Sequence, residues 1–422
     1  MAVTAGSDPE WPDTRRVLLV STDSIAPWPT GSGNRAIRWG LLDGLVRCGI
    51  EVGFYVAAQT GRHAAEFEST RNAFNPKGDR FWLDQPGPKV SAESVAALDR
   101  AMKLFQPDLV LVYGMDALKI ARETSFGGPV GIMSVDLEYL PTLYRHVYNL
   151  RFGRPKQKLK SFLLTPTILF NALRIRNEVL REYPRADFVI NHAAHHASWH
   201  RNHHQRPTIY TPNPVSSLSD ACPPFLANSG PPRFVLVGGI GGIATLTGLA
   251  WFARKVYPLL EPAIMAGAIE VHLIGRGELE ASLDKSMPHL VRRGYVDNLT
   301  EEMRGVTAVL VPTPITLGFR TRIVDAFRHG VTVVAHKANA VGMPELMHGH
   351  SALIAADPKT FSEAILHLAR TPNEAMRLGR AAFEQFKKEL NATVVARRML
   401  DFVQDEVSTT MRPLKSKAGS HD

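Results

Sequence analysis

Apolar runs and helical patterns alternate along the first half of the chain. Val17–Ser21 is a continuous apolar run, which is typical of a strand buried on both faces of a parallel sheet. Apolar residues at helical spacing follow from Ile37 to Leu45, and Glu51–Ala57 has the pattern of a second strand. A strand–helix–strand unit of this kind predicts a parallel sheet. Further strands are expected at Leu109–Tyr113, Val130–Ser134, Asp187–Asn191 and Thr208–Thr211, with a helix through Asn177–Tyr183.

The pattern starts again after residues 216–232, a proline-rich stretch that has the composition of a linker. We expect strands at Phe234–Val237, Glu270–Ile274, within Val291–Val296, at Ala308–Pro312 and at Thr332–Ala335, and helices between Thr360 and Gln404. The sequence therefore predicts an α/β protein of two doubly wound domains. A ligand is expected between them, outside the carboxyl ends of the strands.

Composition and charge narrow the class of protein. Hydrophobic residues make up 45% of the chain and charged residues 21%, which suits a globular protein with a large core. Cys48 and Cys222 are far apart, which excludes a disulfide framework and a cysteine zinc site and favours the cytoplasm. No signal peptide is expected, since Met1 to Arg16 is polar, and no apolar run approaches the roughly 18 residues of a spanning helix. The net charge of +9 allows an anionic partner.

A glycine-rich turn at residues 238–244 is the first candidate for phosphate binding. It follows a strand and opens a helix, so its backbone can approach a phosphate at a helix N-terminus. Gly239, Gly241 and Ala244 fit the dinucleotide pattern, but the next strand ends in Gly275-Arg276 and not in an acidic residue. A tight turn with no ligand is the alternative.

The segment Pro312–Phe327 is more specific, because it reads as a loop that leads into a helix. Arg320 and Arg322 are placed to hold a diphosphate with bidentate contacts. Asp325 lies three residues beyond Arg322 on the same helix face, where a carboxylate could take the two hydroxyls of a ribose. The alternative is a surface ion pair between Arg322 and Asp325.

Several segments carry a family resemblance, mainly in the second half of the chain. They are Gly248–Phe252 with Val256–Leu260, Val271–Gly277, Gly294–Asp297, Gly318–Asp325, Val341–Pro344 and His350–Ile354, and in the first half Pro29–Arg35, Glu178–Asn191 and Pro212–Pro214. In these segments the chain resembles the GT-B glycosyltransferases of the family 4 (group 1) type, from about Arg16 to Phe402. The resemblance implies two Rossmann-like domains facing each other across a cleft. It implies an acceptor-binding domain at 14–215, a nucleotide-sugar donor domain at 216–384, and a helix at 385–410 that returns to the first domain.

The resemblance also implies an activity and a set of site residues. The activity is transfer of a hexose, with retention and without a metal or a cofactor, from a nucleotide-diphosphate sugar to a glycan or lipid-linked acceptor of the cell envelope. In the implied site, Arg320 and Arg322 hold the diphosphate and Asp325 the ribose; Gly31, Gly33, Gly238, Gly239 and Gly318 bring backbone to the donor; Gly275, Arg276 and Val296 line the base pocket; and Asn34, Arg35, Asp136 and Glu138 face the acceptor.

The chain departs from the family pattern at two places. Leu317 and Asp325 stand where two glutamates eight positions apart are usual, and Gly239 and Thr247 fall near the positions of a usual Arg and Lys. These departures leave two alternatives open. One is a GT-B-shaped protein that binds a nucleotide sugar or a glycan without transferring it. The other is a GT-B-like sugar-nucleotide epimerase, which needs no acceptor.

Two further clusters bear on metals and partners. Six histidines lie between His192 and His204, at spacings that could bind zinc, but no cysteine or carboxylate accompanies them, so a partly exposed polar helix is expected. From Tyr139 to Asn177 there are eight Arg and Lys residues and no Asp or Glu, around the apolar patch Phe162–Phe170. Such a segment, at 145–176, could rest on an anionic membrane surface. Its alternative is a core-covering helix with a basic face, and nothing in it favours nucleic acid.

Overall fold

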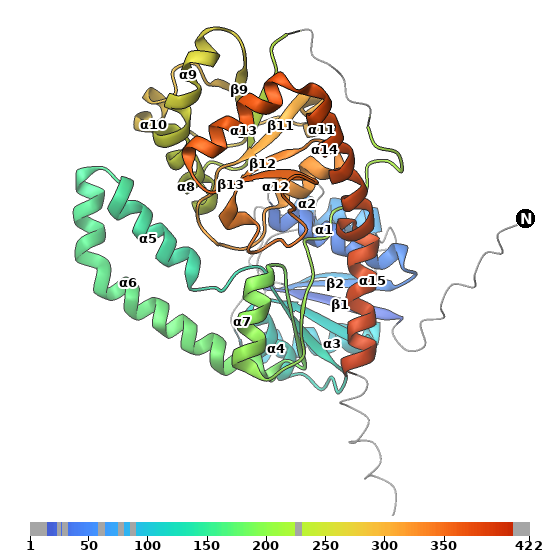
Figure 1. Cartoon of the computed structure of the whole chain (residues 1–422). Coiled ribbons are helices and arrows are strands. Elements are labelled where there is room, and N and C mark those ends of the chain that lie inside the picture. The colour runs from blue at the N-terminus through green and yellow to red at the C-terminus, as the bar shows by residue number, and fades with distance from the viewer. Residues whose placement is uncertain are drawn as a thin grey trace, which may run out of the picture.

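The fold consists of two α/β units that meet along one side, as Figure 1 shows for the computed structural model. The structure describes residues 15–22, 27, 33–57, 64–74, 80–84, 90–223 and 230–407. Its two parallel sheets divide the chain between Tyr210 and Arg233. The α/β class and the GT-B arrangement of two Rossmann-like sheets are therefore confirmed.

The first sheet has seven parallel strands in the order β3-β2-β1-β4-β5-β6-β7. They are β1 (Arg16–Ser21), β2 (Glu51–Ala57), β3 (Phe81–Asp84), β4 (Leu109–Tyr113), β5 (Val130–Ser134), β6 (Phe188–Asn191) and β7 (Thr208–Tyr210). Its helices are α1 (Gly33–Arg47), α2 (Ala64–Phe74), α3 (Ala92–Phe105), α4 (Met115–Arg122) and α7 (Ala194–His204). All the strands expected in this half are present. The edge strand β3 was not predicted, because it is short and follows no clear helical pattern.

The second sheet has six parallel strands in the order β10-β9-β8-β11-β12-β13. They are β8 (Arg233–Val237), β9 (Glu270–Ile274), β10 (Val291–Gly294), β11 (Val306–Val311), β12 (Val333–His336) and β13 (Ala352–Ala355). Its helices are α8 (Ile243–Trp251), α9 (Tyr257–Met265), α10 (Ala281–Lys285), α11 (Leu299–Met303), α12 (Thr321–Arg328), α13 (Pro358–Arg370) and α14 (Pro372–Gln385). Five strands match the sequence prediction. The sixth, β13, was not predicted as a strand and entered only through the resemblance at His350–Ile354.

The last helix, α15 (Ala392–Phe402), lies against the first sheet's helix α1. The two helices approach closely at Gly44, where an added Cβ would stand 2.2 Å from the carbonyl oxygen of Ala392. A bridge between Val215 and Asn391 lies beside this contact. The chain therefore passes between the two units twice, near Val215 and again near Asn391.

A helical hairpin, residues 140–182, stands out from the side of both units, and we call it the arm (Figure 1). It consists of α5 (Leu140–Phe152) and α6 (Pro155–Glu182). The sequence predicted only the end of α6, because Pro166 and the apolar patch interrupt its helical pattern. The part of α6 that carries the apolar patch does not cover the core, since Phe162 and Phe170 are exposed, whereas its end packs into the core at Val179. No helix in the described ranges is both long and apolar enough to cross a membrane.

Candidate donor site

The candidate site lies where the strand order of the second sheet reverses. β9 lies on one side of β8 and β11 on the other, so the loops that leave β8 and β11 diverge at their carboxyl ends. In open parallel sheets this switch point forms the crevice in which ligands bind. The loop after β8 is the glycine-rich turn at 238–242, and the loop after β11 runs from Pro312 to Arg320.

Close backbone approach explains one of the glycines at this edge. Gly275 has φ +152°, and a Cβ there would lie 2.0 Å from the carbonyl oxygen of Gly238. The amide of Gly238 donates to the carbonyl of Ile274 at 2.9 Å, and that of Ile240 donates to Arg276 at 2.9 Å. The turns after β8 and β9 are therefore joined backbone to backbone, which leaves no space for a larger residue at position 275.

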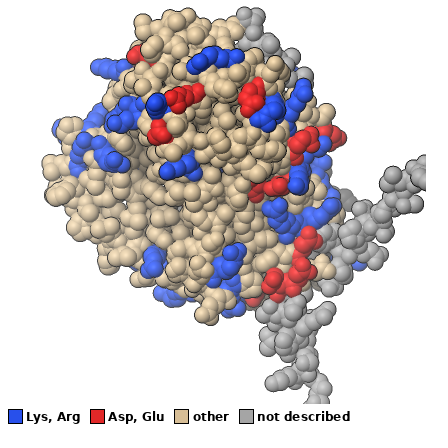
Figure 2. Space-filling view, viewed as in Figure 1, with Lys and Arg blue, Asp and Glu red and all other residues tan. Residues whose placement is uncertain are grey.

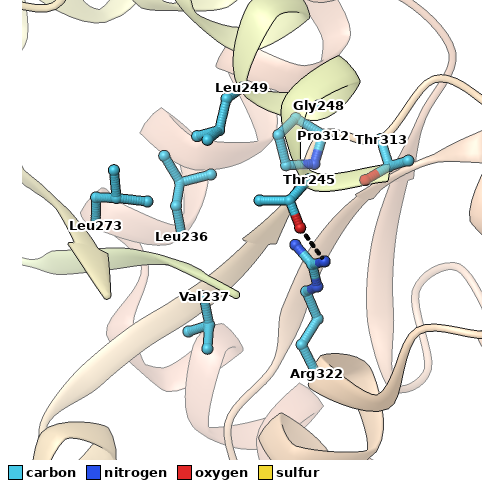
Figure 3. Close-up of a pocket in the computed structure, with 9 residues that line it drawn as sticks. All are labelled: Leu236, Val237, Thr245, Gly248, Leu249, Leu273, Pro312, Thr313 and Arg322. Atoms are coloured by element: carbon cyan, nitrogen blue, oxygen red, sulfur yellow. Dashed lines mark hydrogen bonds between the residues drawn. The ribbon is translucent and has the colours of Figure 1, made fainter. Parts of the chain in front are cut away.

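Arg322 supplies the positive charge that the glycine-rich turn itself lacks. Its guanidinium rises from α12 and donates to Thr245 Oγ1 at 2.8 Å (Figure 3). It also lies 3.1 Å from the point where a Cβ of residue 238 would be, so the absence of a side chain there makes room for it. Burial, followed by the nearby Arg320 cation, lowers the pKa of Arg322 to about 9. A cavity of about 10 Å³ beside it, lined by Leu236, Thr313 and others, has no more room than one water needs.

Arg320 faces Asp136 of the first unit. A Cβ at Gly318 would lie 2.2 Å from Asp136 Oδ1, so the loop after β5 reaches the loop at Pro312–Arg320, which we call the donor loop, across the two units. Burial lowers the pKa of Arg320 to about 10, and burial raises that of Asp136 to about 6 against the opposing effect of Arg320. Arg320 Nη2 donates weakly to Ile315 O at 3.5 Å, while Arg320 Nε and Asp136 Oδ1 have no hydrogen-bond partner among the described residues. Two groups of opposite charge thus face each other with bonding capacity left over.

Other first-unit segments enclose the same loop. Tyr144 Oη of α5 lies 3.4 Å from Thr316 Oγ1, and His195 Nε2 of α7 lies 3.3 Å from the carbonyl oxygen of Thr316. Arg145 of α5 donates to the carbonyl of Gly241, in the glycine-rich turn, at 2.6 Å. Sequence reasoning counted Arg145 with the membrane-facing segment, because only the hairpin's path brings α5 over this turn.

Leu317 has a structural reason to replace the glutamate that the family pattern has at its position. It is 4% exposed and belongs to the same buried apolar cluster as Ile240 and Ile243 of the second unit and Tyr148 of α5. A carboxylate at this position would have to be buried among these side chains. The departure from the family pattern therefore goes together with the packing of α5 onto the second unit.

Asp325 does not pair with Arg322, so the alternative of a surface ion pair between them is wrong. Its carboxylate pairs with Arg328, at 3.0 Å. Arg276 stacks its guanidinium 3.9 Å above the centre of the Tyr295 ring, and Val296 is half-buried beside it. A cavity of about 520 Å³ opens next to them, lined by Gly275, Gly277 and Gly294 and by charged side chains such as Glu278 and Arg293.

The residues expected to face an acceptor are only partly brought together. Glu138 accepts a hydrogen bond from Tyr183 Oη at 3.3 Å inside the first unit, and burial raises its pKa to about 7. Glu138 therefore points into the first unit, whereas Asp136 approaches Gly318 of the second, and the role of both in acceptor binding stays a prediction. Gly33, Asn34 and Arg35 form the first turn of α1, and Gly31 lies outside the described residues.

The histidine-rich helix α7 is partly exposed, as was expected, but most of its histidines lie on the buried face. His192 before the helix and His196, His200 and His204 within it are buried, because a spacing of four places them on one face. The ring of Tyr183 stacks on His200 at 4.8 Å and on His204 at 5.6 Å. Burial lowers the pKa of His200 to about 3. Among the described residues, no group of three or more His, Cys, Asp and Glu side chains could hold a metal ion.

Comparisons with known proteins agree with this architecture. Residues 231–371 match the model of the family "Glycosyl transferases group 1". The chain is similar to sucrose-phosphate synthase from Thermosynechococcus elongatus, with 14% identity, a TM-score of 0.63 and coverage of 94% of this chain and 100% of that one. It is also similar to Anabaena HepE in complex with UDP, with 12% identity, a TM-score of 0.61 and coverage of 92% and 99%.

A third similar structure is the lipopolysaccharide outer core galactosyltransferase WaaB, with 10% identity, a TM-score of 0.58 and coverage of 94% of this chain and 100% of that one. No curated protein matches the chain by sequence. The fold likeness extends over nearly the whole chain, and the family match covers the unit that holds the glycine-rich turn and both arginines. The chain therefore has the GT-B fold, and its second unit matches the model of the group 1 glycosyltransferases.

Proposed function

We propose that the protein transfers a hexose from a nucleotide-diphosphate sugar, and that the diphosphate lies between the glycine-rich turn and the two arginines. One observation carries the proposal. Arg320 and Arg322 have lost hydration through burial; Arg320 faces Asp136, and Arg322 lies near Asp325, which itself pairs with Arg328. Three arginines thus share two carboxylates, so the site holds an excess of positive charge. A bound diphosphate would balance that charge and would meet the N-terminus of α8. HepE, a fold neighbour, has been solved with UDP and with UDP-glucose.

The cavity beside Gly275 and Gly294 is our proposed base pocket, with Arg276 stacked on Tyr295 at its edge. Its distance along the sheet edge from Arg322 is set by the joined turns after β8 and β9. Asp325 is proposed for the ribose, since it follows Arg322 by one helical turn. In this role it would exchange its contact with Arg328 for two sugar hydroxyls.

The proposed reaction retains the configuration of the sugar. The bond from the anomeric carbon to the diphosphate oxygen breaks, an acceptor oxygen bonds to the same face of that carbon, and the acceptor proton leaves with the diphosphate. The chain's part is to position both substrates and to stabilise the charge that develops on the departing oxygen. We assign that stabilisation to Arg320 and Arg322 and propose that no metal or cofactor is needed.

We propose that the acceptor is a glycan or a lipid-linked sugar of the cell envelope, bound on the first domain by Asn34, Arg35 and Asp136. Asp136 is the best supported of these, because its free Oδ1 lies beside the donor loop at Gly318. The fold likeness to a lipopolysaccharide galactosyltransferase supports this class of acceptor. The proposed place of work is the cytoplasm, at the inner face of the membrane.

The test is thermal stabilisation of the full chain by a panel of nucleotide diphosphates and their sugars, with EDTA present. A ligand at a hundredfold excess over its Kd stabilises the folded state by about 2.7 kcal/mol, which is a clear shift in Tm. Arg322→Ala should abolish the shift, and Arg377→Ala, an exposed arginine paired with Glu374, should keep it. No shift with any nucleotide, or an equal shift in both variants, would contradict the donor site.

Product analysis then separates the alternatives. Transfer requires an acceptor, so a nucleotide sugar incubated alone should stay unchanged apart from slow hydrolysis. Conversion of the sugar without an acceptor would identify an epimerase. Tight nucleotide-sugar binding with no turnover in the presence of envelope glycans and lipid-linked sugars would identify a protein that binds without transferring.

A further inference from the structure

The arm has one face that the rest of the chain does not cover. The inner face of α6 is closed by α5 and the body: Ser161 and Ala172 are buried, and Thr165 Oγ1 lies 3.1 Å from His146 Nε2 of α5. The outer face carries Leu159, Phe162, Leu163, Phe170 and Leu173, each between 58% and 69% exposed. Folding of this chain therefore does not account for these apolar side chains.

The outer side chains form a continuous stripe. Residues 159, 162, 163, 166, 170 and 173 are spaced by three and four, so they share one side of a helix with 3.6 residues per turn. The stripe lies opposite the buried positions 161, 165 and 172. Contiguous apolar surface of this kind, framed by polar residues, marks a site of interaction with a protein or a membrane.

Positive charges lie along both edges of the stripe. At about 100° per residue, Lys156, Lys160 and Arg174 lie on one side of it and Lys158 and Arg176 on the other. No Asp or Glu occurs between Tyr139 and Asn177. The flank of the molecule where α6 lies shows tan and blue surface with no red (Figure 2). An apolar stripe between two basic rows is the pattern of a helix that lies in the plane of a membrane surface.

We propose that the arm docks on an anionic lipid bilayer through this stripe, with α6 parallel to the surface. The charge pattern favours a lipid bilayer over a second copy of the chain. A second copy of the chain would bring its own basic rows beside these, and like charges at close range oppose pairing. Anionic lipid headgroups would pair with both rows of basic side chains. The leucines and phenylalanines of the stripe would be buried at the boundary between the headgroups and the acyl chains. α6 is not apolar enough to span the bilayer, and its inner face is held by α5.

The arm can dock on a bilayer whether or not the protein transfers a sugar; only the purpose of docking rests on the proposed function. Docking would keep the enzyme beside lipid-linked acceptors. The donor site is made of other residues, so donor binding and lipid binding can succeed or fail separately.

Co-flotation of the full chain with vesicles tests the docking. The vesicles are phosphatidylcholine alone or with about one third phosphatidylglycerol, at low and high salt. Each basic residue near an anionic surface contributes about fivefold in affinity, so Lys156→Gln/Lys158→Gln/Lys160→Gln should weaken binding by about 100-fold. Phe162→Ser/Phe170→Ser should abolish binding to the anionic vesicles. All these side chains are exposed, so the variants should keep the wild-type Tm and its shift with nucleotide.

Control variants carry comparable substitutions of exposed side chains elsewhere. Leu104→Ser replaces a 76% exposed leucine of α3, and Lys359→Gln/Lys388→Gln removes two exposed lysines of the second domain. Both should bind as the wild type does. The proposal is overturned if the wild type binds no anionic vesicles at low salt, or if the phenylalanine variant binds as well as the wild type. It is also overturned if the stripe proves to hold a second copy, seen as a dimer that the phenylalanine variant loses.

Discussion

Replacing Gly318 with alanine tests the contact between the donor loop and Asp136. Gly318 has φ +60°, a conformation that costs a residue with a Cβ roughly 1–2 kcal/mol. The new Cβ would also lie 2.2 Å from Asp136 Oδ1, well inside van der Waals contact, so the buried carboxylate or the loop must move. Overpacking of this kind costs roughly 1–3 kcal/mol. The expected total loss is therefore about 2–5 kcal/mol.

The assay is urea unfolding, together with nucleotide-diphosphate affinity by calorimetry. Gly349→Ala is the matched control, since Gly349 has φ +73° with nothing within 4 Å of an added Cβ. It should lose only the backbone part, roughly 1–2 kcal/mol, and keep its affinity. In the Gly318→Ala background, Asp136→Ala should recover the overpacking part. Equal losses of stability and affinity in the two glycine variants would refute the reasoning.

Two further predictions concern buried side chains. Leu317→Glu should lower the free energy of unfolding in urea by more than about 3 kcal/mol, because the carboxylate would enter the apolar cluster around Tyr148. Leu317→Met should lower it by less than about 1.5 kcal/mol. A stable glutamate variant would mean that position 317 reaches solvent or ligand. The His200 ring is neutral in the folded state, where its pKa is about 3, against 6.5 in the unfolded state. Its contribution to stability is complete above pH 6.5. As the pH drops from 6.5 to 3, only the unfolded state gains the proton, so the free energy of unfolding decreases by about 1.36 kcal/mol per pH unit. His200→Phe should therefore narrow the gap in stability between pH 7.5 and pH 5, and an unchanged gap would contradict the burial of a neutral ring.

Strands were the most predictable part of the fold. A parallel strand buried on both faces is a short apolar run, so Leu109–Tyr113 and Glu270–Ile274 were bounded correctly from the sequence alone. The strands β3 and β13 were missed, although β10 and β12, which have the same length, were predicted. The length of α6 was missed because its outward face is apolar, which contradicts the usual rule that polar residues face outward.

The sequence identified candidate site residues by their chemistry and position, but it did not identify the residues that they contact. The sequence placed Arg320 and Arg322 at the start of a helix, which is correct, but it could not show that Arg322 would reach Thr245 or that Asp136 would approach Gly318. Those contacts join segments 77 or more positions apart in the chain. They depend on how the two sheets face each other, which no local pattern encodes.

The position of α5 limits how the two domains can move. The chain crosses between the domains near Val215 and near Asn391, and these two crossings define a hinge axis. α5 belongs to the first domain in sequence, yet Arg145 bonds to Gly241 and Arg254 stacks 4.5 Å from the centre of the Phe152 ring. These contacts form a third connection between the two domains, away from the hinge axis. α6 is anchored on the first domain as well, where Glu178 pairs with Lys119 at 2.5 Å and Val179 is buried in the core. The arm therefore bridges both domains, and a bilayer that holds it would restrain their motion relative to each other.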